Sequence, residues 1–103
     1  MTLDTTYSVN NVPIRLTEER WEHITDRRPY MISYYDEMLD AIERPTWILP
    51  GHNGGLIAVR SIGRFKYLHV VYREASLEDG FIVTAYIARK VNKRRTIWRE
   101  EDQ

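Results

Sequence analysis

Hydrophobic and polar residues alternate along the segment GFIVTAYIARK near the C-terminal end of the chain. Because successive side chains of a strand point to opposite faces, the alternation predicts a strand over Gly80–Val91. One face of this strand is wholly apolar: Phe81, Val83, Ala85 and Ile87. The other face has two polar residues at its centre, Thr84 and Tyr86. The second face is therefore either in contact with water or a working surface.

Three more strands are predicted before this one. Alternation indicates strands over Leu56–Ile62 and Phe65–Glu74, and Gly63–Arg64 between them suits a two-residue hairpin turn. The segment TWIL is a short strand followed by the turn-forming residues PGHNGG, and ASLEDG is a longer loop before the last strand. This order predicts an antiparallel meander.

A first helix is predicted ahead of the sheet. Thr17 is a typical N-cap residue, and Glu18 and Glu19 in the first turn oppose the positive end of the helix dipole. The helix runs to about Asp26 and ends before Pro29, because the residue before a proline avoids the helical region.

A second helix is predicted over roughly Tyr30–Glu43, and Pro45 ends it. Its apolar residues recur at steps of three and four: Met31, Tyr34, Tyr35, Met38, Leu39 and Ile42. Such a stripe is typical of a helix that packs on a core. We therefore expect an α+β fold, with two N-terminal helices packed on one face of a roughly four-stranded antiparallel sheet.

The turns also predict which strand residues face one another. The first turn pairs Arg60 with Tyr67, and an assumed pairing of Arg73 with Ile82 across the second loop brings His69 opposite Tyr86. The face under the helices is then apolar: Ile57, Val59, Leu68, Val70, Phe81, Val83, Ala85 and Ile87. The opposite face collects a polar set: Arg60, Tyr67, His69, Arg73, Thr84 and Tyr86. A slip of the second register by one residue would scatter this set.

Length and composition fit one globular domain over residues 1–103, with 43% hydrophobic and 29% charged residues. The helical part would cover about 17–44 and the sheet about 46–91. The absence of cysteine excludes disulfides, thiol catalysis and cysteine-ligated zinc. No apolar run is long enough to span a bilayer, and the first ten residues lack the features of a signal peptide. We expect a cytoplasmic protein without a membrane partner.

Charge is unevenly distributed although the formal net charge is zero. A zero net charge argues against a protein that coats nucleic acid by bulk charge, but it allows a local basic patch. The segment 89–99 contains six basic residues and no acidic one: Arg89, Lys90, Lys93, Arg94, Arg95 and Arg99. This basic segment is either a solvated tail or a phosphate-binding element, and both interpretations stay open.

The polar set contains the parts of a ribonuclease that needs no metal. Two arginines can hold a phosphate, a histidine can exchange protons, and tyrosines can stack on bases. On the first helix, Arg20, His23 and Arg27 share one stripe, so His23 could join the site. Each piece also has a structural interpretation, because strand histidines are often structural and surface arginines often pair with carboxylates. The histidines show no metal-ligand spacing, so neither a metal nor another cofactor is expected.

Three strings, IRLTEERWEHITDRRP, YLHVVYRE and FIVTAYIARKV, resemble the phage-associated nuclease families of the barnase, EndoU, colicin and RelE-like group. The resemblance covers residues from about 14 to 98 and implies helices on a four-stranded antiparallel sheet, with metal-independent RNA cleavage by a toxin or effector domain. It implies that His23 is the helix histidine, that Thr84 and Tyr86 are the polar residues of the last strand, and that Arg60 and Arg73 are the basic strand residues. Related sequences often carry a histidine where this chain has Arg28.

The first hypothesis is therefore a small ribonuclease, the toxin of a pair with a neutralising antitoxin protein. His23 is the first choice as general acid or base and His69 the second, while Arg60 and Arg73 hold the phosphate and Thr84 and Tyr86 position it. The residues expected to bind RNA are Arg27, Tyr67, Lys90, Lys93, Arg94 and Arg95. The alternatives are a non-catalytic module of the same fold that binds RNA or a protein, and a structural or regulatory protein without nucleic acid. The oligomeric state stays open.

Overall fold

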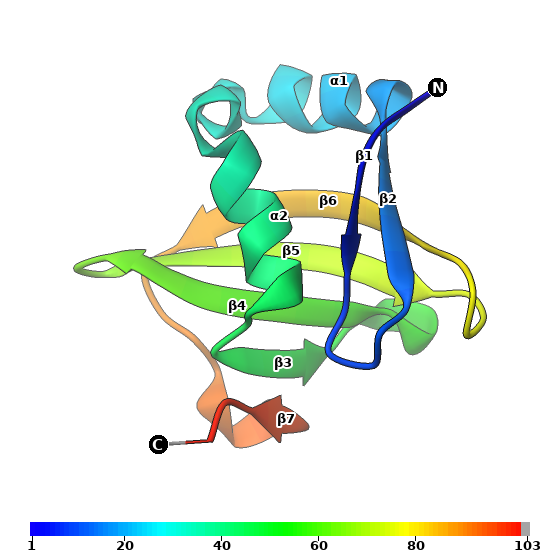
Figure 1. Cartoon of the computed structure of the whole chain (residues 1–103). Coiled ribbons are helices and arrows are strands. Elements are labelled where there is room, and N and C mark those ends of the chain that lie inside the picture. Colours follow the sequence, from blue (N-terminus) through cyan, green and yellow to red (C-terminus); the bar gives the residue numbers. More distant parts are fainter. Residues whose placement is uncertain (102–103) are drawn as a thin grey trace.

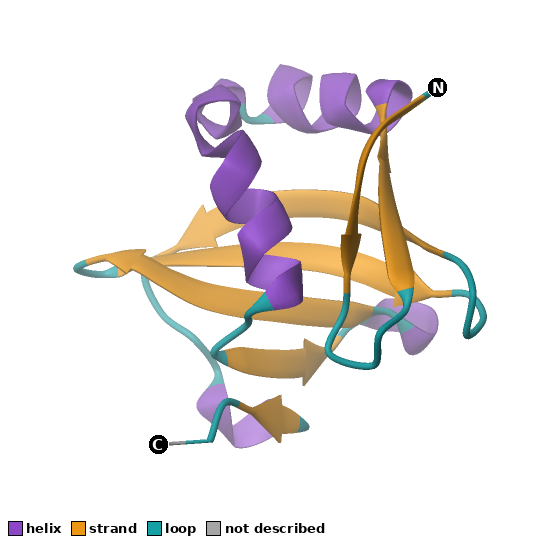
Figure 2. Cartoon of the chain, viewed as in Figure 1, coloured by secondary structure: helices purple, strands orange, loops and turns teal. Residues whose placement is uncertain are grey.

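The computed structural model describes residues 1–101 and contains one mixed sheet of seven strands in the order β1-β2-β6-β5-β4-β3-β7 (Figures 1 and 2). The strands are β1 Thr2–Tyr7, β2 Pro13–Thr17, β3 Trp47–Pro50, β4 Leu56–Gly63, β5 Lys66–Glu74, β6 Gly80–Ala88 and β7 Trp98–Arg99. The α-helices are α1 Glu18–Arg27 and α2 Tyr35–Glu43. Three short 3₁₀ segments complete the described elements: η1 Pro29–Tyr34, η2 His52–Gly54 and η3 Lys93–Arg95.

The expectation of a roughly four-stranded antiparallel sheet is wrong. Strands β1 and β2 form a hairpin on one edge, where β2 pairs in parallel with β6, and β7 extends the other edge next to β3. Strands β1 and β7 carry little hydrophobic signal, because only Thr6 of β1 is buried and β7 has two residues. Their pairing depends on the strand beside them rather than on an apolar face of their own. Strand β2 differs, because Ile14 and Leu16 alternate with polar residues and are fully buried.

The first helix begins as predicted. The hydroxyl oxygen of Thr17 accepts a hydrogen bond from the backbone N–H of Arg20 at 3.2 Å, and the helix ends at Arg27. The single helix predicted over Tyr30–Glu43 is instead the 3₁₀ segment η1 followed by α2. The two are separated at Tyr34, whose φ of −121° lies outside the helical range.

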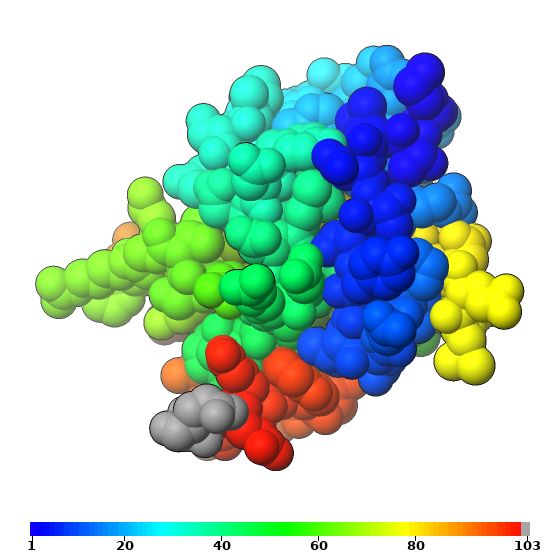
Figure 3. Space-filling view, in the orientation of Figure 1, coloured from blue at the N-terminus to red at the C-terminus, as the bar shows by residue number. Residues whose placement is uncertain are grey.

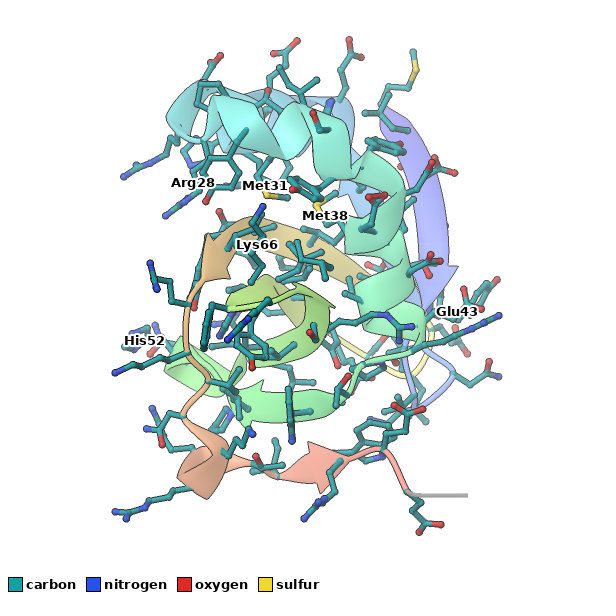
Figure 4. The ribbon with its side chains drawn as sticks, turned by 90° about the vertical axis from the view of Figure 1, so that its left-hand side faces the viewer. Arg28, Met31, Met38, Glu43, His52 and Lys66 are labelled. Atoms are coloured by element: carbon teal, nitrogen blue, oxygen red, sulfur yellow. The ribbon has the colours of Figure 1, made fainter. Side chains whose placement is uncertain are left out.

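Helix α2 covers one side of the sheet, whereas α1 lies above the β6 border of the sheet (Figure 1). Helix α1 packs along β6 and β2, while α2 crosses β4 and β5 next to β1 (Figure 1). In the space-filling view the helices and the β1–β2 hairpin hide most of the sheet from this side (Figure 3). Met31 and Met38 point from the helical layer into the core (Figure 4). On the sheet, the fully buried partners include Leu68, Val70 and Tyr72.

The β4–β5 hairpin turns one residue later than predicted. Gly63 pairs with Lys66, the turn residues are Arg64 and Phe65, and a bulge in β4 leaves the registers of the two strands shifted by one residue. Arg60 therefore pairs with Leu68 instead of Tyr67. A shift of one residue moves every side chain of β4 to the other face.

Burial in β4 follows this shift. Ala58, rather than Val59 or Ile57, lies in the core under the helices, and Val59 is buried on the opposite face. Arg60 leaves the predicted polar face. Its guanidinium donates a hydrogen bond to the backbone carbonyl of Arg44, the residue that ends α2.

A second bulge interrupts the pairing of β5 with β6. His69 pairs with Tyr86 as predicted, and Val71 pairs with Thr84. Tyr72 then pairs with Ile82, so Val83 has no partner residue on β5. The extra residue reverses the alternation beyond it. Leu68, Val70 and Ala85 are fully buried as predicted, whereas the predicted burial of Phe81 and Val83 is wrong: both are half-buried, and Ile82 takes the core position.

No helix within residues 1–101 is long and apolar enough to cross a membrane.

The central core residue Leu68 provides a test of this packing. Leu68→Ala removes buried methyl groups at a position of 0% exposure, so we expect the free energy of unfolding to fall by about 2–5 kcal/mol. Leu77→Ala is the matched control, because Leu77 is 85% exposed and its loss should change stability by less than about 0.5 kcal/mol. Urea titration followed by circular dichroism measures both. Equal losses in the two variants would contradict the packing described.

Candidate functional site

Two adjoining depressions form a groove on the side of the sheet away from α2. They share Val83 and Thr84 of β6 and measure about 270 and 410 Å³. The first is also lined by residues of α1 and its C-cap: Arg20, His23, Arg27 and Arg28. The second is also lined by residues of the η2 loop and the neighbouring strands: Gly51, His52, Asn53, Gly55, Ile57, Val71, Arg73 and Tyr86. We call the two together the basic groove.

Local structure explains why these side chains meet. Arg20, His23 and Arg27 recur at three- and four-residue steps, so α1 presents them along one stripe. The bulge in β6 places Val83 at the groove, because it releases this residue from the helix-covered face. Thr84 follows on the same side, opposite Val71. The helix and the bulged strand thus build the junction between the two depressions.

Tyr86 is held from both sides. Its ring stacks on that of His69, with centroids 4.9 Å apart and planes at 16°, and the Arg28 guanidinium carbon lies 5.5 Å from its centroid. Burial raises the pKa of the Tyr86 phenol, and the positive charge of Arg28 opposes this rise. The hydroxyl is therefore protonated at neutral pH, and it can donate a hydrogen bond to a phosphate oxygen.

His69 lies behind Tyr86 rather than in the groove. Its side chain is 5% exposed, and its Nδ1 is 2.9 Å from the carbonyl oxygen of Tyr67. Burial lowers the pKa of His69, although the bond to the backbone carbonyl acts in the opposite direction. The neutral ring with its proton on Nδ1 satisfies this hydrogen bond. The structure thus gives His69 a place where it orients Tyr86 and does not reach a substrate.

His52 reaches the groove, although the sequence indicated only a turn at this position. Arg73 donates a hydrogen bond of 3.3 Å to the His52 carbonyl oxygen, which ties the η2 loop to β5. Figure 4 shows Arg28 and His52 on the same side of the molecule, with Glu43 on the other. A histidine within a run of glycine and asparagine does not by itself indicate a functional site. Only the pairing of β3 with β4 places His52 at the groove.

Apart from His69, the predicted site residues fall into four places. His23, Arg27, Arg73, Thr84 and Tyr86 line the basic groove. Arg60 lies at the end of α2, apart from them. Tyr67, Lys90 and Lys93 line another depression with Phe65, Arg89 and Val91. Arg94 and Arg95 are exposed on η3.

Positive charge in the basic groove is not neutralised within residues 1–101. The ion pairs of that part of the chain join Arg15 to Asp79 and Arg44 to Glu43, and no acidic residue is among those that line the groove. In the same residues, no three His, Asp or Glu side chains lie close enough together to hold a metal ion. The groove therefore favours an anion.

Comparisons of this chain with protein-family models, curated proteins and solved structures find no match.

The buried histidine predicts a pH dependence of stability. In the unfolded chain a histidine takes up a proton at about pH 6.5, whereas His69 in the fold resists it, because burial lowers its pKa. Stability should therefore fall as the pH drops from about 7.5 to about 5. In His69→Asn, which keeps a donor for the Tyr67 carbonyl but does not titrate, the fall should be smaller.

Urea titrations at the two pH values measure these differences in the free energy of unfolding. His23→Asn is the control, because His23 is exposed on α1 and should leave the acid-induced loss close to that of the wild type. If His69→Asn loses as much stability as the wild type, the buried neutral state of His69 is wrong.

Proposed function

We propose that this chain is a cytoplasmic, metal-independent endoribonuclease that cleaves RNA by attack of the 2′-hydroxyl. The observation that carries the proposal is the basic groove. It combines four arginines, two histidines, a threonine and a protonated tyrosine, and none of the residues that line it is acidic. The resemblance to the barnase, EndoU, colicin and RelE-like nuclease group supports the same function.

The arginines supply the binding part of this function. Guanidinium groups bind phosphate oxygens in pairs, and donors fixed before the reaction stabilise charge that develops on a phosphate. Arg28, the C-cap of α1, lines one depression of the groove, and Arg73 of β5 lines the other. This local arrangement allows a chain of zero net charge to hold a polyanion.

The reaction needs two proton transfers. One group accepts the proton of the 2′-hydroxyl while the 2′-oxygen forms a bond to phosphorus. The bond from phosphorus to the 5′-oxygen breaks, and a second group gives that oxygen a proton. The products are a 2′,3′-cyclic phosphate and a 5′-hydroxyl, and no redox partner or metal is required. His23 and His52 are the two histidines at the groove, so we assign the transfers to them.

One observation favours the alternative of a non-catalytic RNA-binding module. Within residues 1–101, the ring nitrogens of His23 and His52 have no hydrogen-bond partner that would orient them, and both side chains are exposed. Histidines that transfer protons are commonly oriented by a second group. Arginines and Tyr86 alone suffice to bind RNA. The toxin role and its antitoxin partner are proposed from the resemblance.

His23→Ala tests catalysis. A general acid or base contributes about 10²–10⁴-fold in rate, so cleavage of a fluorescent RNA should fall by that factor while circular dichroism stays unchanged. Glu22→Ala is the matched control, because Glu22 is the exposed neighbour on α1 and does not line the groove. Wild-type cleavage should persist in EDTA and yield a cyclic phosphate. Expression of the wild type, but not of His23→Ala, should inhibit bacterial growth.

The outcomes separate the two functions. If purified protein binds RNA but cleaves none, the binding module is the better account. If cleavage occurs and neither His23→Ala nor His52→Ala slows it, the assignment of the proton transfers is wrong.

The basic segment predicts a second measurable property. Each phosphate contact with a single strand contributes about 0.7 to the slope of log affinity against log salt. Replacing Lys93, Arg94 and Arg95 with Ala should therefore lower that slope by up to about 2 if all three contact RNA. Fluorescence anisotropy at several salt concentrations measures the slope. An unchanged slope would show that the segment is a solvated end.

A further inference from the structure

Apart from the basic groove, a separate depression lies at the tip of the β4–β5 hairpin and measures about 380 Å³. It is lined by two aromatic rings, three cationic side chains and one aliphatic one: Phe65, Tyr67, Arg89, Lys90, Lys93 and Val91. We call it the aromatic pocket. Its volume falls within the range of about 300–1,000 Å³ that is usual for small-molecule sites. Among residues 1–101, no acidic residue lines it, so it suits a flat ring that carries a phosphate.

Phe65 has an unusual place in this pocket. It is a turn residue with φ of 55°, a left-handed conformation in which glycine or asparagine is usual. Phe65 is also 54% exposed, at a hairpin tip that projects from the body of the molecule (Figure 3). A phenylalanine at this position therefore has neither a favourable backbone conformation nor full burial. Unfavourable local conformations of this kind are characteristic of functional sites.

Cations and rings alternate around Phe65 and Tyr67. The guanidinium carbons of Arg64 and Arg89 lie 5.2 and 5.8 Å from the Phe65 ring centroid. Tyr67 lies next to Trp47, with centroids 6.2 Å apart, and the Lys93 amine is 4.9 Å from the Trp47 ring. Aromatic faces beside positive charges are the combination on which proteins stack unpaired bases.

The aromatic pocket lies on the same face of the sheet as the basic groove. Tyr67 precedes His69 by two residues on β5, and the His69 ring stacks on Tyr86 of the groove. Two residues of a strand span about 7 Å. An RNA strand whose reacting phosphate sits in the groove can therefore place a neighbouring base in the pocket.

From this geometry we infer that the aromatic pocket is a base-stacking subsite, and that the substrate of the proposed ribonuclease is single-stranded RNA. The inference rests on the proposed function. Single strands are required because the faces of paired bases are covered by their neighbours in a helix. A protein segment is the competing occupant, but three cations among the lining residues form no ion pair within residues 1–101, and they favour a polyanion.

Phe65→Gly is the decisive variant. Glycine adopts the left-handed turn without strain, so unfolding in urea should show unchanged or increased stability. The probe is a labelled 2′-O-methyl RNA of about 12 nucleotides, which lacks the attacking hydroxyl. We expect its affinity in fluorescence anisotropy to fall about tenfold, with Phe65→Trp restoring it. Tyr7→Ala removes an aromatic residue that is 51% exposed on β1 and should leave the affinity unchanged.

Kinetics separate this subsite from the proposed function. For a cleavable strand of the same length, Phe65→Gly should raise KM about tenfold with little change in kcat, whereas a dinucleotide should be affected much less. If the wild type binds the 2′-O-methyl strand through Phe65 but cleaves no RNA, catalysis fails and the subsite stands. If RNA is cleaved and Phe65→Gly changes neither affinity nor KM, the subsite fails. If the wild type binds no RNA at low salt, both fail and a protein occupant is favoured.

Discussion

The pairing of β5 with β6 is the interaction on which the rest of the structure depends. It joins the two long central strands and fixes which residues lie under the helices and which face away from them. On one side it brings Val70 and Ala85 into the core, and on the other it stacks His69 on Tyr86. A single bulge at Val83 then reverses which side chains of β6 face the core. Residues of this one strand therefore contribute to both the core and the groove.

Charge is divided between the two sides of this sheet. Helix α2, which covers the core side, carries four acidic residues: Asp36, Glu37, Asp40 and Glu43. The opposite side holds the basic groove and the aromatic pocket, neither of which is lined by an acidic residue. A formal net charge of zero thus coexists with depressions lined by basic residues, because the acidic and basic residues are separated in space.

The two proposed sites adjoin each other at His69. His69 is buried between the two sites, receives support from the Tyr67 backbone and holds the ring of Tyr86. Tyr67 belongs to the aromatic pocket and Tyr86 to the basic groove. A neutral, buried imidazole suits this role, because a charged one would have to leave the interior. His69, a candidate for catalysis in the sequence, is therefore placed to orient Tyr86 of the basic groove.

The sequence by itself determined the elements whose signals are local. The N-cap at Thr17, the alternation of the central strands and the stripe of Arg20, His23 and Arg27 all depend on residues within a few positions of one another. Tertiary structure alone decided the rest. The edge strands β1 and β7 take their pairing from a neighbour, β2 pairs with the distant strand β6, and the two bulges depend on how strands meet. These bulges removed Arg60 from the predicted polar face and brought Val83 to the groove, and strand pairing placed His52 there. A register shift of one residue reverses a face, and no local pattern encodes it.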